Sequence, residues 1–385
     1  MKIYFQEIVN NISKDVECWL KQYDLVWPAE TAGRKKREVG FKNIVRSLTG
    51  FFVKPQLSNV ETIYVFEGLR NKAYMEIFNP ECVVIVGSHI EKKYAKSHGY
   101  KFCWSFPIDS AVHSKIHFAW DFLIFHQIQV WINNLSKYKQ VVFFLCEDTR
   151  PLGIFFVHIG RVLKPKATSV CIQHGYFLRS SYKLRRDGLL SDINFVWDEE
   201  QIAVGGFKRS STMVIGLPYE AVAKPTSRLK IILVGDSEKS LLTYVEIYNV
   251  LHYFLGLEVI YRPHPNEWQQ ELLDGKLKKM FLLLDNMNKV ERLNGPRAIF
   301  IGTVSSLLYE AGVAGHFVAC LKGGGRDAPL FNYDFEFSPL QVSALVKWIS
   351  IINESPNINF LFREKNYCSP QKKFMNALNS AKITY

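Results

Sequence analysis

Short, continuously apolar segments alternate along most of this chain with stretches of helical spacing. The segments ETIYVFEG (61–68), ECVVIVGSH (81–89) and KQVVFFLCED (139–148) each contain an uninterrupted run of four to six apolar residues, and each ends in glycine or polar residues. Strands that are apolar on both faces belong to parallel sheets covered by helices on each side. The alternation therefore predicts an α/β fold, with further strands at 167–175, 192–198, 230–240, 257–267, 281–285, 297–306 and 316–321.

One segment interrupts this alternation. Residues 212–230, TMVIGLPYEAVAKPTSRLK, contain two prolines between two runs of the pattern. A chain of 385 residues has room for two domains of ordinary size. We therefore predict two Rossmann-like domains that face each other across a cleft. The expected boundaries are 1–220 and 221–385, and the last helix is free to pack back on the first domain.

The charge of the chain favours an anionic partner. The sequence has 48 Lys and Arg against 36 Asp and Glu, which gives a net charge of +12. The densest basic cluster is GRKKR at 33–37, and a smaller one includes Lys183, Arg185 and Arg186. Each of these two basic clusters can be a solvated part of the surface, or it can contact an anionic membrane. No zinc-finger spacing, RNP-like motif or basic heptad is present, so we do not expect a nucleic-acid partner.

The compartment follows from the cysteines and from the hydropathy pattern. Seven cysteines are scattered along the chain without a CxxC pair, which is typical of a reducing environment. The N-terminal residues are not a signal peptide, and no stretch reaches the roughly 20 apolar residues that span a bilayer. We expect a cytoplasmic protein that can lie peripherally on the inner face of the cytoplasmic membrane.

Ligands of open parallel sheets bind beyond the carboxyl ends of the strands. The polar residues that follow the predicted strands are therefore the candidate site residues. In the first domain they are Gly87, Ser88, His89, Glu147, Asp148, Gln173, His174 and Gly175. In the second domain they are Gly235, Asp236, Ser237, Arg262, Pro263, His264, Pro265, Gly302, Thr303, Val304, Ser305 and Ser306.

The segment GTVSSLLYEAG (302–312) is the most informative of these. A predicted strand ends in a hydroxyl-rich turn that leads into a helix, and free N–H groups at a helix start bind anions. Glu310 follows Ser306 by four residues, so its carboxylate can accept hydrogen bonds from the two hydroxyls of a ribose. The alternative is an ordinary serine N-cap with Glu310 on the surface.

The segment VIYRPHPNE (259–267) ends a predicted strand of the same sheet. The prolines at 263 and 265 stiffen the chain on both sides of His264, whose ring can donate a hydrogen bond to a ligand. A rigid turn with an exposed histidine is the competing interpretation. Because both motifs follow strands of one small sheet, we favour a shared ligand.

In the first domain an acidic pair ends a strand. Glu147 or Asp148 can act as a general base whose pKa is tuned by its neighbour, and His174 can orient an acceptor or stabilise a leaving group. Capping of the helix at 151–163 and a structural role in the turn are the alternatives. No HExxH motif, His/Cys cluster or strand-end DxD pair is present, so no metal or cofactor is expected.

The order of these motifs resembles the GT-B glycosyltransferases of bacterial surface-polysaccharide assembly, in particular the group of sialyltransferases, polysialyltransferases and Kdo transferases. The matching motifs are the acidic pair Glu147-Asp148, the His264-Pro265 motif and the Ser305-Ser306 motif, and CIQHG (171–175) is similar to capsule and teichoic-acid enzymes. The similarity covers about residues 140–320. The family's acidic motif continues into glycine, whereas Thr149 follows here.

The resemblance implies a metal-independent transferase with the GT-B fold. His264, Ser305, Ser306 and Glu310 would hold the CMP of a CMP-activated acidic sugar, and Glu147 or Asp148 would deprotonate the acceptor hydroxyl. Arg262 would help to stabilise the departing phosphate. The acceptor would be a glycan or a lipid-linked sugar of the O-antigen, capsule or lipooligosaccharide. The alternatives are a UDP- or GDP-sugar donor, a CDP-polyol phosphate donor, and a non-catalytic nucleotide-binding protein.

Overall fold

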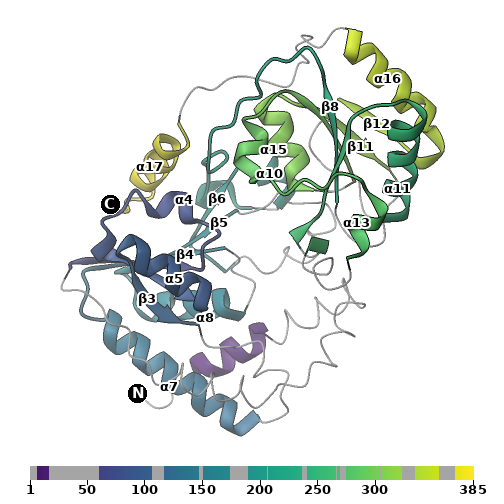
Figure 1. Cartoon of the computed structure of the whole chain (residues 1–385). Helices are drawn as coiled ribbons and strands as arrows, with labels where there is room; N and C mark the ends of the chain where they lie inside the picture. Colours follow the sequence, from purple (N-terminus) through teal and green to yellow (C-terminus); the bar gives the residue numbers. More distant parts are fainter. Residues whose placement is uncertain are drawn as a thin grey trace. The chain divides into compact units, whose positions relative to one another are not determined.

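The computed structural model of the chain describes residues 7–16, 60–105, 117–146, 151–173, 190–205, 207–235, 241–265, 267–268, 275–303, 305–322, 334–354 and 369–385. These residues divide into two compact units. The first unit takes the described residues up to 173, 190–218 and 370–385, and the second takes those in 219–369. Each unit contains one parallel sheet (Figure 1).

The sheet of the first unit has seven parallel strands in the order β3-β2-β1-β4-β5-β6-β7. They are β1 (Thr62–Glu67), β2 (Val83–Gly87), β3 (Lys101–Trp104), β4 (Gln140–Leu145), β5 (Ala167–Ile172), β6 (Ile193–Val196) and β7 (Thr212–Val214). The strands predicted from the apolar runs are present, and β3 and β7 are additional edge strands. The strand order reverses between β1 and β4, which makes their ends the switch point of this sheet.

Both faces of this sheet are buried, as the continuous apolar strands predict. On β1, Ile63 and Val65 pack into a core with α7 (His117–Leu135), α8 (Pro151–Val162) and the helix at 7–16. The alternate residues Tyr64 and Phe66 pack on the opposite face. That face is covered by α4 (Lys72–Met75) and by α17 (Pro370–Ser380), and α5 (His89–His98) follows β2.

The helix α17 brings the end of the chain back to the first unit. Its Phe374 stacks on Tyr74 with 4.2 Å between ring centroids and lies edge-on to Phe195. The hydroxyl of Tyr64 donates to the backbone carbonyl of Thr384. These contacts make the C-terminal residues part of the core of the first unit.

The second unit has five parallel strands in the order β12-β11-β10-β8-β9. They are β8 (Lys230–Val234), β9 (Val259–Arg262), β10 (Ala298–Gly302), β11 (Phe317–Leu321) and β12 (Phe335–Phe337). Its helices are α11 (Leu241–Asn249), which continues into a π-helical turn at Val250–Phe254, α13 (Lys276–Met280), α14 (Lys289–Leu293), α15 (Ser306–Ala314) and α16 (Val342–Glu354).

One predicted strand of the second unit is wrong. Residues 281–285 form only a single bridge, between Leu284 and Tyr261. Leu282 and Leu283 are exposed, and the backbone N–H of Leu282 donates to the hydroxyl of Tyr248 rather than to a neighbouring strand. The backbone N–H of Tyr261 donates to the carbonyl of Leu283, and the N–H of Asp285 donates to the carbonyl of Tyr261. Among the described residues the segment therefore pairs with β9 at one position and does not continue as a strand.

Candidate functional site

The polar ends of three strands meet at the centre of the second sheet. β8 lies between β9 and β10, with Val234 opposite Arg262 on one side and opposite Gly302 on the other. The chain order places β9 on one side of β8 and β10 on the other, so this junction is the switch point of the sheet. The prediction that the histidine and serine motifs follow strands of one sheet is confirmed, and β8 separates the two motifs.

The turn that carries His264 is held by Glu267. The backbone N–H of His264 donates to Oε2 of Glu267 at 2.6 Å, and the hydroxyl of Tyr261 donates to the same carboxylate at 3.1 and 3.2 Å. Glu267 is 7% exposed. Pro265 begins a helical turn in which Glu267 occupies the third position, so the carboxylate caps the turn in the manner of a capping box.

Gly235 lies at the end of β8 against this turn. A Cβ atom on Gly235 would lie 2.2 Å from Oε2 of Glu267, 2.5 Å from the hydroxyl oxygen of Tyr261 and 3.0 Å from the backbone N of His264. Only glycine leaves space for that arrangement. The close packing of the His264 turn therefore explains why a glycine is needed at position 235. Contact between Gly235 and a ligand stays a prediction.

On the other side of β8 the loop after β10 is held by a second core tyrosine. The backbone N–H of Thr303 donates to the hydroxyl of Tyr244 at 3.1 Å. Thr303 is 3% exposed, and within the described residues its Oγ1 has no hydrogen-bond partner. A buried hydroxyl without a partner is unfavourable in a ligand-free protein. Thr303 is one of the residues for which the sequence predicts contact with a ligand, and a ligand could supply the missing hydrogen bond.

The helix α15 starts three residues after Thr303. Ser305 is its N-cap, and its Oγ accepts the backbone N–H of Leu307 at 3.3 Å. Ser306 is the first helical residue, and both serines are partly exposed. The capping alternative is thus correct for Ser305 without a ligand, and a helix start of this kind still presents N–H groups to an anion.

Glu310 is buried on α15, so the alternative that it is a surface residue is wrong. It is 1% exposed, and its Oε2 accepts the hydroxyl of Tyr219 and contacts Nζ of Lys289 at 2.8 Å. Burial raises the pKa of Glu310 to about 8. Burial, followed by the charge of Arg262, lowers the pKa of Lys289 to about 8. The direct contact opposes both shifts, because each charge stabilises the other.

Arg262 belongs to a buried ion network beside this pair. Its NH1 donates to Oδ2 of Asp285 at 3.0 Å, and Arg292 donates to both oxygens of the same carboxylate at 2.8 and 2.9 Å. The Asp285 side chain is 1% exposed. Burial favours a higher pKa for Asp285, but the hydrogen bonds and charges of the two arginines outweigh it and the pKa is lowered. Arg262 has this structural role, and phosphate contact stays a prediction.

Gln173 of the first unit is also part of a structural network. Its amide nitrogen donates to Gln201 at 2.7 Å, and its amide oxygen accepts the backbone N–H of Trp197 at 2.7 Å. The backbone carbonyl of Gln173 accepts the indole N–H of Trp197. These bonds connect the end of β5 to the segment after β6. Substrate contact by Gln173 stays a prediction.

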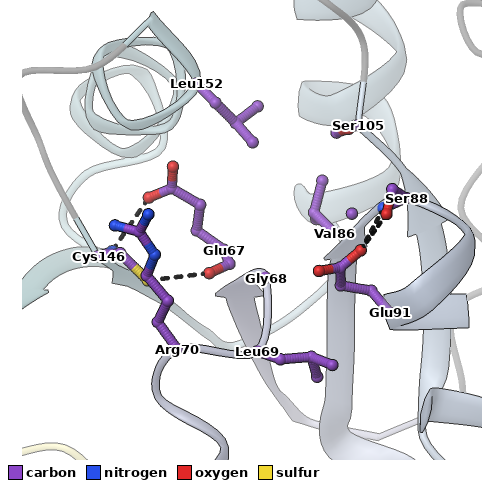
Figure 2. A pocket seen from close by; sticks show the side chains of 11 residues that line it. Glu67, Gly68, Leu69, Arg70, Val86, Ser88, Glu91, Ser105, Cys146 and Leu152 are labelled. Atoms are coloured by element: carbon purple, nitrogen blue, oxygen red, sulfur yellow. Dashed lines mark hydrogen bonds between the residues drawn. The ribbon is translucent and has the colours of Figure 1, made fainter. Parts of the chain in front are cut away.

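A pocket of about 300 Å³ opens at the switch point of the first sheet. Figure 2 shows Glu67, Arg70 and Cys146 along one wall and Ser88 and Glu91 along the opposite wall. The other described residues of the lining are Leu69, Val86, Ser105, Leu152 and two glycines, Gly68 and Gly87.

Several predicted residues lie outside the described part of the chain. These are Glu147, Asp148, His174, Asp236, Ser237 and the basic cluster at 33–37. Within the described residues no group of three or more His, Cys, Asp or Glu side chains could hold a metal ion. Among the same residues no helix is long and apolar enough to cross a membrane.

Sequence reasoning missed the residues that hold the site in place. Tyr219, Tyr244, Glu267 and Lys289 contact the predicted residues from other elements, and Glu67 and Arg70 line the pocket of the first unit. Glu67 and Arg70 follow a predicted strand, so the strand-end rule should have included them. Tyr219 and Lys289 have no such signal, because their contacts to Glu310 join residues far apart in sequence.

No known protein family and no curated protein matches the sequence of the chain. Among solved structures, UDP-GlcNAc 2-epimerase from Methanocaldococcus jannaschii is similar at TM-score 0.50 and 13% identity, over 83% of this chain and 99% of that one. UDP-N-acetylglucosamine 2-epimerase from Rickettsia bellii is similar at TM-score 0.50 and 10% identity, over 83% and 94%. A calicheamicin glycosyltransferase has a TM-score of 0.46 at 9% identity, over 84% and 98%. The two likenesses at TM-score 0.50 confirm the predicted fold class: the chain has the GT-B fold, with two parallel-sheet units.

Proposed function

We propose that this chain is a glycosyltransferase that moves an acidic sugar, such as sialic acid, Kdo or a related ulosonate, from a CMP-activated donor to a hydroxyl of a bacterial surface glycan. The observation that supports it best is the junction at the switch point of the second sheet. There Gly235 and the His264 turn follow β8 and β9, and Thr303 and the start of α15 follow the adjacent β10. The buried hydroxyl of Thr303 has no hydrogen-bond partner among the described residues.

Each part of this junction has a matching part in a nucleotide. The start of α15, with Ser305 and Ser306, would bind the phosphate through N–H groups and hydroxyls. The hydroxyl of Thr303 would gain a hydrogen bond that none of the described residues gives it. Glu310 would accept ribose hydroxyls: Tyr219 and Lys289 both contact Oε2, and among the described residues Oε1 has no partner.

His264 would stabilise the charge that develops on the leaving phosphate. The imidazole can donate a hydrogen bond to an oxyanion, and a turn fixed by two prolines and Glu267 keeps the donor in place before the reaction. The acceptor would be activated from the first unit, where Glu147, Asp148 and His174 are the predicted residues. The chain would work without a metal ion, on a lipid-linked or glycan acceptor at the inner face of the cytoplasmic membrane.

A UDP-sugar enzyme is the second candidate. Two solved structures with the same fold are named for UDP-GlcNAc, which keeps UDP in consideration. Enzymes that use GDP-sugars or CDP-polyol phosphates, and a non-catalytic nucleotide-binding protein, are the remaining alternatives.

A thermal-shift panel with CMP, CTP, UDP and GDP separates these candidates. A ligand that binds only the folded chain stabilises it by about 2.7 kcal/mol at 100 times its Kd. We expect CMP or CTP to raise the melting temperature most, with and without EDTA. Stabilisation by UDP alone would support the second candidate, and an EDTA-sensitive shift would contradict the metal-independent site.

A further inference from the structure

The pocket of the first unit occupies the position where open parallel sheets bind ligands. It lies beyond the carboxyl ends of β1, β2 and β4, at the point where the strand order reverses. Its volume of about 300 Å³ is at the lower end of the range for small-molecule sites. A ligand of one sugar ring suits this size better than an oligosaccharide.

Glu67 is held at the edge of this pocket by the neighbouring strand end. Its Oε2 accepts the backbone N–H of Cys146 at 3.0 Å, and the thiol of Cys146 donates to the backbone carbonyl of Glu67 at 3.1 Å. Gly68 then adopts φ +67°, a left-handed conformation that favours glycine, and the chain turns so that Arg70 also lines the pocket. The Glu67 carboxylate is therefore positioned by the backbone before any substrate binds.

The opposite wall carries a second carboxylate. Glu91 accepts the backbone N–H of Ser88 at 2.7 Å and also its hydroxyl, in a capping box that starts α5. Burial favours a higher pKa for Glu91, but the bonds from Ser88 outweigh it and the pKa is lowered. Glu91 thus stays ionised and accepts hydrogen bonds. Two carboxylates and one guanidinium give the described residues of the lining a formal charge of −1.

We propose that this pocket binds an uncharged sugar ring of the acceptor and that Glu67 is the general base of the transfer. Carboxylates on two walls suit a ligand with several hydroxyl donors, and their surplus negative charge disfavours an acidic sugar. The partly exposed Leu69 and Leu152 offer apolar surface to the ring carbons. The proposal rests on the proposed function and assigns the base to Glu67 in place of Glu147 or Asp148.

The chemical step balances with groups that the enzyme and its substrates supply. The acceptor hydroxyl oxygen forms a bond to the anomeric carbon of the donor, while its proton moves to the carboxylate of Glu67. The bond between the anomeric carbon and the phosphate oxygen breaks, and its electron pair leaves with the nucleotide. The protonated Glu67 then returns its proton to solvent.

Sugar binding is tested first, by saturation-transfer NMR on the full chain. The probes are the methyl glycosides of glucose, galactose and N-acetylglucosamine, together with methyl glucuronide. We expect a signal from at least one neutral glycoside and none from the glucuronide. Ser105→Trp, which fills the pocket, should reduce that signal at least threefold. Ser97→Trp, an exposed position on α5 outside the pocket, should leave it unchanged.

The base is tested by nucleotide release from the donor that the thermal-shift panel identifies, with the sugar that gives the strongest NMR signal as acceptor. Glu67→Gln should lower turnover at least about 100-fold, as loss of a general base does. Formate should restore part of the activity of Glu67→Ala, an effect that a structural role would not give. The matched control is Glu61→Gln, an exposed residue just before β1 that pairs with Lys139.

The outcomes distinguish the two proposals. If no neutral glycoside binds, or the glucuronide binds best, the pocket assignment is wrong. If Glu67→Gln keeps more than a tenth of the activity, or formate restores nothing, Glu67 is not the base. If no nucleotide stabilises the wild-type chain, the proposed function fails instead, whereas sugar binding to the pocket is measured independently of any nucleotide.

Discussion

The backbone N–H of His264 donates to the carboxylate of Glu267, and that carboxylate also accepts the hydroxyl of Tyr261 from the core of the sheet. The histidine turn is therefore fixed from two directions. Prolines restrict the chain on both sides of His264, and Glu267 ties the turn to β9. A site that must meet a phosphate at a defined position gains from this rigidity, because less conformational entropy is lost on binding.

Replacing Glu267 tests whether this rigidity matters for the ligand. Glu267→Gln removes the charge that accepts from His264 and Tyr261, and loss of such a bond costs about 1–3 kcal/mol. We expect the affinity for CMP to fall roughly tenfold, as measured by calorimetry. Glu246→Gln, an exposed position on α11, is the control. Equal affinities for the two variants would show that the turn does not need Glu267.

Gly235 tests the steric limit at the end of β8. In Gly235→Ala the added Cβ would meet Glu267 and Tyr261 at less than van der Waals distance, so the turn must move. We expect a loss of about 1–3 kcal/mol in stability and a smaller thermal shift with CMP. The control is Gly312→Ala on α15, where the new Cβ would make an ordinary 3.6 Å contact with Val318. A lower stability in the control alone would refute the argument.

Thr303 offers a test in which stability and binding change in opposite directions. Thr303→Val keeps the shape of the side chain and removes a buried hydroxyl that has no partner among the described residues. The ligand-free variant should be as stable as the wild type or up to about 1 kcal/mol more stable. The stabilisation by CMP should decrease, because the ligand loses a hydrogen bond. A variant that binds CMP as well as the wild type would exclude Thr303 from the site.

Glu310 is tested with altered sugars on the nucleotide. If its carboxylate accepts ribose hydroxyls, the wild type should bind CMP more tightly than 2′,3′-dideoxycytidine monophosphate. Glu310→Gln should narrow that difference to within about threefold, since a neutral amide is a weaker acceptor. Glu291→Gln, exposed on α14, should preserve the difference. An unchanged preference in Glu310→Gln would place the ribose elsewhere.

Asp285 makes stability depend on pH in the acid range. Its pKa is lowered in the folded chain, so its contribution is complete above the unfolded value of about 3.9 and is lost as the pH falls through the folded pKa. Asp285→Asn removes a buried carboxylate from two partly buried arginines and should cost about 3 kcal/mol at pH 7, the lower end of the range for a broken buried pair.

Urea unfolding of this variant at pH 7 and at a pH below the folded pKa of Asp285 measures the effect. The gap between wild type and Asp285→Asn should shrink in acid, because the wild-type carboxyl is then protonated. Glu291→Gln again serves as the control. A gap that is the same at both pH values would mean that the ionised form of Asp285 does not stabilise the fold.

The buried strands were predictable because each carries its own signal. Runs such as those of β4 and β10 are apolar on both faces, and only a covered parallel sheet buries both. The edge strand β3 was not expected, since four residues, KFCW, with only Cys103 fully buried give no clear pattern. The run at 281–285 has the composition of a strand, but its contact with Tyr248 depends on tertiary structure that hydropathy does not contain.

The candidate site, like the fold, was predictable only where the signal is local in the sequence. Strand ends identified His264, Thr303 and Ser305, because chain order and strand direction determine which loops share an edge. The partners of Glu310 were not predictable, since Tyr219 and Lys289 are 91 and 21 positions away in sequence. Local spacing does not report such contacts. The predicted acidic pair and His174 lie outside the described residues and stay predictions.

The return of α17 to the first unit has a consequence for gene truncations. A premature stop codon just before Pro370 would leave the coding sequence of the second unit intact. The first unit would be destabilised instead, because Tyr74 and Phe195 would lose their ring contacts with Phe374. A frameshift in the codons for residues 370–385 would therefore damage the unit whose other residues are encoded first.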